Sequence, residues 1–230
     1  MYKFYSKAIA IVFSLTLFFV LLFASVNIIV YNMDYYKWHY EKRDIDINTG
    51  MEMNDLVMVT EKLLNYLKND DDNLNMKKLI NGKVEEVFGD REKSHMVDVK
   101  KMSVAATATR NYGAILVIAI ITLAYINNKK LFLYILSSIK YVFIGTTAIV
   151  LGIGALLLID FNKYFTIFHE IFFTNDLWLL DPQTDILINM VPEVFFFNTA
   201  MLVILLFLLI SSIVIVGAEK AKKKMKIKLG

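Results

Sequence analysis

The sequence has no cysteine, only two prolines and only nine glycines among its 230 residues. The absence of cysteine excludes disulfide bonds, thiolate metal ligands and a thiol nucleophile. The scarcity of proline removes the commonest interruption of long helices. The chain is instead rich in apolar residues, with 57% hydrophobic and 13% aromatic. A soluble domain of this length needs more polar surface, so the composition predicts an integral membrane protein.

Four apolar blocks each approach the roughly 20 residues that a helix needs to cross about 30 Å of hydrocarbon. They cover Ala8–Val30, about Val104–Ile126, about Tyr141–Ile159 and Val194–Val216. The first block follows two lysines, as the core of a signal peptide would. It is longer than the roughly 7–15 residues of such a core, so we expect it to stay in the membrane.

Lysine and arginine predict the orientation. The N-terminus, the connector 127–140 and the tail after Val216 hold eleven lysines, whereas 160–193 holds one lysine and six acidic residues. Because positive residues favour the cytoplasmic side, both termini are expected in the cytoplasm and 160–193 outside. Leu131–Ile139 is apolar between lysines and is expected to form an interfacial helix, since Lys140 would be costly at mid-bilayer. The alternative is one long tilted third span with Lys140 reaching out of the membrane.

The expected fold is an all-α membrane protein with four transmembrane helices and a mainly helical extracytoplasmic domain between spans one and two. Six segments follow in order. They are the cytoplasmic N-terminus and first span (1–30), the extracytoplasmic domain (31–103), spans two and three with their cytoplasmic connector (104–159), an extracytoplasmic interfacial loop (160–193), the fourth span (194–216) and a basic cytoplasmic tail (217–230).

Local patterns predict helices in the two outer segments. Asn54–Lys68 has apolar residues at spacings of three and four, and a helix capped by Asp90 is expected to run unbroken into the second span. Four phenylalanines at helical spacing predict another helix from Phe161. Asp181 is expected to cap a short helix that continues through Asp185 to Met190. The aromatic run 31–39 is typical of a membrane interface, with His39 as a polar residue at headgroup level.

Two histidines are expected to share one outer site. His95 has Glu92 three residues before it and Asp98 three residues after it on the predicted helix, so carboxylates could orient its ring. His169 lies among phenylalanines beside Glu170, and burial there would keep it neutral, as a base requires.

Two alternatives remain open at this stage. Two histidines with a carboxylate could bind zinc in a metal-dependent membrane hydrolase, although His169–Glu170 lacks the second histidine of an HExxH motif. There is no GxSxG motif for a serine hydrolase. A non-catalytic binding or assembly protein on the outer face is the other alternative.

Two stretches, Phe88–Met102 and Phe168–Phe196, resemble the hallmark stretches of the lipoprotein intramolecular transacylases of low-GC Gram-positive bacteria. The likeness is close over about forty residues and extends loosely over the four-span layout. This resemblance implies transfer of the sn-2 acyl chain of a diacylglyceryl-cysteine lipoprotein to the α-amino group of the same cysteine. The product is an N-acyl, S-monoacylglyceryl (lyso-form) lipoprotein of the bacterial cell envelope.

The resemblance also implies the site. His95 and His169 would be the catalytic pair. From their surroundings we expect His169 to be the base and His95 to polarise the ester or protonate the leaving oxygen. The partners would be diacylglyceryl-modified lipoproteins and membrane lipid, with no nucleic acid, cofactor or metal. Supporting roles are expected for Glu92, Asp98, Glu170, Asp181 and Asp185, and substrate or lipid contacts for Arg110 and Trp178, although capping is the commoner use of an aspartate and anchoring of a tryptophan.

Overall fold

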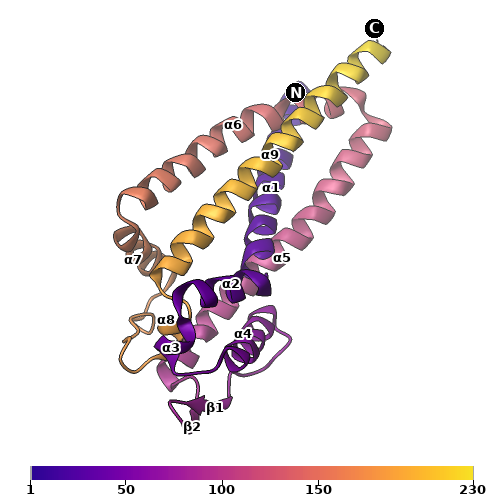
Figure 1. Cartoon of the computed structure of the whole chain (residues 1–230). Coiled ribbons are helices and arrows are strands. Elements are labelled where there is room, and N and C mark those ends of the chain that lie inside the picture. Colours follow the sequence, from indigo (N-terminus) through magenta and orange to yellow (C-terminus); the bar gives the residue numbers. More distant parts are fainter. Residues whose placement is uncertain (1, 230) are drawn as a thin grey trace. The chain divides into compact units, whose positions relative to one another are not determined.

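The computed structural model describes residues 2–229, which are mostly helical (Figure 1). The elements in chain order are α1 (Tyr2–Val30), α2 (Met33–Arg43), α3 (Ile45–Thr49), α4 (Met53–Lys68), β1 (Lys77–Ile80), β2 (Lys83–Glu86), α5 (Asp90–Asn127), α6 (Lys129–Ile159), α7 (Phe161–Phe172), α8 (Ile186–Met190) and α9 (Glu193–Leu229). The chain divides into two compact units. Unit 1 consists of residues 2–27, 106–155 and 201–229, and unit 2 of residues 28–105 and 156–200.

The helices of unit 1 confirm the four expected spans by length and composition. α1, α5, α6 and α9 are each long and apolar enough to cross a membrane. A narrow core of side chains from all four helices is buried, including Phe13, Ile135, Phe143 and Phe207. Most other apolar side chains of this unit point outward, as expected where the surrounding solvent is lipid rather than water.

The expected interfacial helix at Leu131–Ile139 is wrong, because α6 is one continuous helix from Lys129 to Ile159. Its buried stripe runs through Ile135, Ile139 and Phe143 with helical spacing, past Lys140, whose side chain is exposed. Since Lys140 lies off this stripe and no helix breaker is nearby, the chain has no reason to stop there. The alternative of one long third helix is therefore the correct one.

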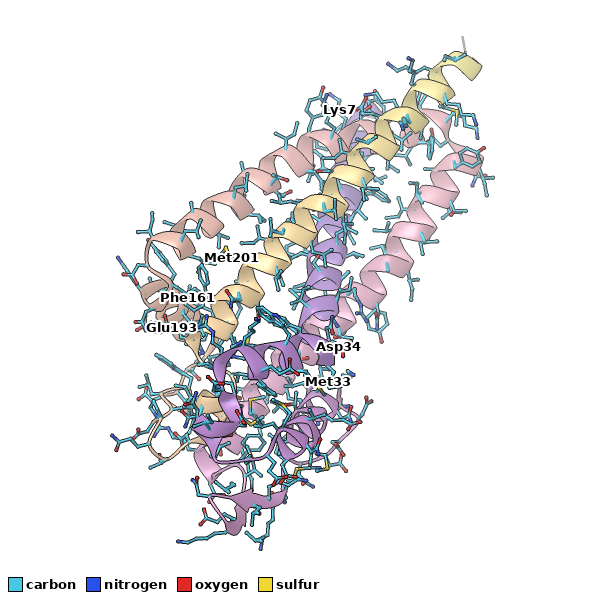
Figure 2. The ribbon with its side chains drawn as sticks, in the orientation of Figure 1. Lys7, Met33, Asp34, Phe161, Glu193 and Met201 are labelled. Atoms are coloured by element: carbon cyan, nitrogen blue, oxygen red, sulfur yellow. The ribbon has the colours of Figure 1, made fainter. Side chains whose placement is uncertain are left out.

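Unit 2 is built around a core shared by α2, α4, α8 and the first turns of α5 and α9. The apolar face predicted within Asn54–Lys68 is confirmed, because α4 buries Leu56, Val59, Leu63 and Tyr66 against this core. The prediction of a helix that continues unbroken from Asp90 into the second span is also confirmed by α5. The start of α7 is tied to the start of α9, since Asn162 Nδ2 donates to Glu193 Oε2 at 2.9 Å, close to Phe161 (Figure 2).

A β-hairpin in unit 2 was not expected. Strands β1 and β2 pair antiparallel with Lys77 opposite Glu86 and Ile80 opposite Lys83. The two turn residues, Asn81 and Gly82, both have positive φ, at 50° and 79°. An Asn-Gly pair is the sequence most suited to a two-residue hairpin turn of this kind, so the mainly helical segment also contains one small sheet.

One local expectation is corrected. Asp181 does not cap a helix: its Oδ1 accepts from Gln183 N in a turn, and α8 begins only at Ile186. Pro182 lies in the turn 182–184 and not in the first turn of a helix. His39 is buried in α2 with 1% of its surface exposed, and its ring packs edge-on against Phe195 of α9; its position at headgroup level stays a prediction.

Candidate functional site

His95 lies near the start of α5, and the side chain of Glu92 holds this end of the helix in place. The Glu92 carboxylate accepts from Gly89 N and from Leu187 N, both at 2.6 Å, so it joins the start of α5 to α8. Its side chain is almost fully buried. Charge-assisted bonds to two backbone donors are strong enough to hold a buried carboxylate. Glu92 therefore anchors the helix that carries His95, and does not orient the imidazole as expected from its spacing.

His169 lies in the last turn of α7, a helix capped by Asp160, which accepts from Lys163 N at 3.1 Å. The Nδ1 atom of His169 lies 2.7 Å from the backbone oxygen of Phe165. A carbonyl oxygen can only accept, so Nδ1 carries the proton and Nε2 has the free lone pair. Burial lowers the pKa of His169, and the bond to Phe165 raises it by less. Both features suit a neutral base whose reactive atom is Nε2.

The structure brings His95 and His169 together, as expected. Their ring centroids lie 6.2 Å apart with an interplanar angle of 37°. The rings are 8% and 7% exposed, and Phe173 contacts both, at 5.2 Å and 5.5 Å. Nδ1 of His95 is buried and has no hydrogen-bond partner within the described part of the chain. A buried nitrogen without a partner costs free energy, so it is a natural point for a substrate group to bind.

Trp178 lies on the face of the His169 ring. The two rings are stacked, with centroids 4.7 Å apart and an interplanar angle of 26°. The segment that carries it, 174–180, is tied to α5 by two hydrogen bonds. Arg91 donates to the backbone oxygen of Asp176, and Asn175 Nδ2 donates to Asp98 Oδ2 at 3.0 Å. Phe173, Asn175 and Arg91 were not singled out by sequence reasoning, because only the fold brings them to the histidines.

The other expected site residues make hydrogen bonds or ion pairs with groups other than the two imidazoles or are exposed, although Asp98 is near enough to His95 to interact with it electrostatically. The carboxylate of Asp98 also pairs with Lys101 at 3.0 Å, and Glu170 is exposed on α7. Asp185 accepts from Asp181 N at 2.7 Å, which closes the turn before α8. Arg110 belongs to unit 1, where its Nε donates to Asn111 Oδ1 at 3.0 Å. The amide of Asn27 is best oriented with its oxygen towards Arg110, and that oxygen then accepts from the guanidinium at 3.0 Å.

The zinc alternative needs a third ligand beside the two histidines. Between residues 2 and 229, no group of three or more His, Cys, Asp or Glu side chains is placed to hold a metal ion. Glu92, the buried carboxylate on the helix of His95, already uses its oxygens on two backbone amides. Among the described residues, His95 and His169 therefore have no third side chain placed beside them that would complete a zinc site.

The fold and the site define a polytopic helical membrane protein in which two buried imidazole rings lie with their centroids 6.2 Å apart. The family model of the lipoprotein intramolecular transacylase Lit matches residues 11–196. The chain therefore belongs to this family of membrane enzymes, which confirms the family resemblance and makes the non-catalytic alternative wrong. No curated protein matches the sequence.

Solved structures support the same fold. The membrane integral lipoprotein intramolecular transacylase Lit from Bacillus cereus superposes with a TM-score of 0.78 at 23% identity, over 98% of this chain and 99% of that chain. Two variants of the Bacillus cereus protein, with a histidine replaced by alanine or by arginine, superpose with a TM-score of 0.76 at 23% identity. These matches cover 98% of this chain and 97% or 96% of theirs.

Proposed function

We propose that this enzyme moves the sn-2 acyl chain of a diacylglyceryl-cysteine lipoprotein to the α-amino group of the same cysteine. The product is the N-acyl, S-monoacylglyceryl form. The observation that carries the proposal is the pair of buried histidines whose rings lie 6.2 Å apart, in a chain of the transacylase family. One of them, His169, has its reactive tautomer set by a backbone carbonyl.

The reaction forms one bond and breaks another within a single substrate molecule. The α-ammonium group, with an ordinary pKa near 8, first loses a proton, and the free amine attacks the carbonyl carbon of the sn-2 ester. The nitrogen, which now carries the acyl carbon, loses a second proton, the C–O bond to the glycerol breaks, and the departing oxygen takes up one proton. Because both reactants belong to one molecule, holding them together is worth up to about 7–11 kcal/mol of the barrier, and no acyl-enzyme is needed.

The two histidines supply the proton transfers. His169 Nε2 has a free lone pair and accepts a proton from the ammonium group. His95 donates a hydrogen bond to the ester oxygen and supports the charge that develops there, or it takes up the second proton of the nitrogen and gives it to the departing glycerol oxygen. Burial of both rings supports this division, since it favours neutral imidazoles near pH 7.

A direct test compares the three histidine-to-glutamine variants of the purified protein. The substrate and the product have equal mass, because the acyl chain moves within one molecule. The assay must therefore measure loss of the free α-amine by amine labelling, with tandem mass spectrometry of the lipopeptide. We expect His95→Gln and His169→Gln each to slow N-acylation on the order of 10²–10⁴-fold, while His39→Gln is the matched buried control. If either catalytic variant works at the normal rate, the assignment is wrong.

We also propose that segments 31–103 and 160–193, with the site, face the outside, and that both termini are cytoplasmic. The distribution of lysines supports this orientation. The chain has no cysteine, so a single introduced cysteine reports its own side of the membrane. Val84→Cys, at a position in β2 that is 71% exposed, should react with a membrane-impermeant maleimide in intact cells, whereas Lys223→Cys should not. The reverse labelling pattern would overturn the orientation.

A further inference from the structure

The base of the proposed reaction is enclosed by aromatic rings. Phe165 lies edge-on at 4.4 Å and Phe168 at 5.5 Å, both from α7. Phe173 contacts the ring at 5.5 Å, and Trp178 stacks on its face at 4.7 Å. Among these four rings, Trp178 is the one contributed by the segment 174–180, and removing it would uncover one whole face of the imidazole.

The segment 174–180, which we call the strap, is held against α5 on both sides of His95. Arg91 lies four residues before His95 and Asp98 three residues after it, so both share its face of the helix. Arg91 donates to Asp176 O, and Asp98 accepts from Asn175 Nδ2 at 3.0 Å. Within the strap, Leu177 N donates to Asn175 Oδ1 at 3.1 Å. Helix α5, which carries His95, therefore also holds the strap that places Trp178 over the ring of His169.

We propose that Trp178 is a positioning residue that keeps water away from His169, so that the acyl chain passes to the substrate amine and not to water. This inference rests on the proposed function, because it concerns how that reaction is kept from becoming hydrolysis. Exclusion of water from reactive groups is an established use of closed sites.

The competing reaction uses the same base and differs only in the nucleophile. A water molecule next to Nε2 would give a proton to His169, and its oxygen would bond to the sn-2 carbonyl carbon. The bond from that carbon to the glycerol oxygen would break, and the oxygen would take the proton. The products would be a free fatty acid and an S-monoacylglyceryl cysteine whose α-amine is still free. The two histidines serve either nucleophile, so the preference for the amine depends on its position in the same molecule as the ester and on keeping water away from the base.

The test follows the fate of the sn-2 chain. The full-length protein in detergent is given a synthetic lipopeptide whose cysteine carries a dipalmitoylglyceryl group with a deuterated sn-2 chain. Trp178→Ala should release deuterated palmitate and leave free amine, with the ratio of released acid to N-acyl product rising at least about tenfold. Trp178→Phe should keep most of the transfer activity. Trp38→Ala is the matched control, because Trp38 stacks on Tyr35 and is 49% exposed.

A second readout separates water exclusion from a merely structural role. The titratable group that faces His169 from α5 is His95, and Glu170 on α7 is exposed. Burial is the main cause of the lowered pKa of His169, so uncovering the ring should raise that pKa. The acid limb of the pH–rate profile of Trp178→Ala should therefore move to higher pH, and that of Trp38→Ala should not move.

If Trp178→Ala does not fold, the hydrogen bond between Asn175 and Asp98 that holds the strap against α5 can be changed instead. Asp98→Asn keeps an oxygen that can accept from Asn175, whereas Asp98→Ala does not. Released palmitate should increase in Asp98→Ala and in Asn175→Ala, and stay near the normal level in Asp98→Asn. If folded variants lose transfer without releasing palmitate, Trp178 does not exclude water and the inference is wrong. If the unaltered protein makes no N-acyl peptide, it is the proposed function that fails.

Discussion

The third histidine of the chain gives a quantitative prediction about stability. His39 is 1% exposed, its ring lies edge-on to Phe195 at 5.0 Å, and its Nε2 has no hydrogen-bond partner among residues 2–229. Burial, with a smaller contribution from the positive charge of Arg43, lowers the pKa of His39 from 6.5 to about 4. The folded protein therefore keeps this ring neutral at a pH where the unfolded chain protonates it.

The sign follows from the proton balance of the two states. Well above pH 6.5 the ring is neutral in both the folded and the unfolded state, so protonation of the unfolded chain does not lower the free energy of unfolding there. As the pH falls from 6.5 towards 4, only the unfolded chain takes up the proton, so the free energy of unfolding decreases. With about 1.4 kcal/mol for each pKa unit, the loss is about 2 kcal/mol at pH 5 and about 3 kcal/mol at pH 4.

The measurement is thermal unfolding of the detergent-purified protein between pH 7.5 and 4.5, compared with the variant His39→Phe. Phenylalanine has a similar shape and no titrating group, so it keeps the packing against Phe195. His95 and His169 titrate in both proteins, and the difference between the two curves isolates His39. The unaltered protein should lose its stability relative to the variant as the pH falls. Parallel curves over this range would refute the reasoning.

Two further substitutions test packing inside each unit, Glu92→Ala in unit 2 and Gly113→Leu in unit 1. Glu92→Ala removes the acceptor of two buried amide bonds, including the one from Leu187 at 2.6 Å, and should cost about 3 kcal/mol in thermal or denaturant unfolding, since it leaves buried donors unpaired. Gly113→Leu places a Cβ 2.8 Å from a methyl group of Val20, so it should separate α1 from α5 and cost about 1–3 kcal/mol. Gly145→Leu, where a Cβ meets no atom within 4 Å, is its control and should leave the unfolding midpoint almost unchanged.

The elements that the sequence predicts well are those specified by local pattern. The four spans follow from apolar length, and the face of α4 follows from residues three and four apart such as Val59 and Leu63. The unbroken α5 follows from the lack of proline between Asp90 and Asn127. Each of these features is fixed by interactions within one helix or by the solvent around it, so no knowledge of the tertiary structure is needed.

The elements that were missed depend on residues distant in the chain. Whether Asp181 caps a helix or closes a turn depends on where α8 packs, and the start of α8 is held by the bond from Leu187 N to the distant Glu92. The burial of His39 is decided by Phe195, far along the sequence. The hairpin is the exception, because Asn81-Gly82 between two short strands is a local signal that could have been recognised.

The carboxylates around His95 show what tertiary structure adds to a spacing argument. Helical geometry places Glu92 and Asp98 near the imidazole, which suggests an ion pair that would favour the charged ring. In the structure Glu92 binds backbone amides and Asp98 binds Asn175, so both serve to fix surrounding segments. The charge of Asp98 still favours an imidazolium at His95, but burial opposes it more strongly, and His95 Nδ1 is buried without a hydrogen-bond partner among the described residues. A pair of neutral, desolvated imidazoles suits an amine that must lose a proton and an ester that must not meet water. In the proposed reaction the site would favour transfer over hydrolysis by keeping water away from the histidines as much as by holding the amine and the ester next to them.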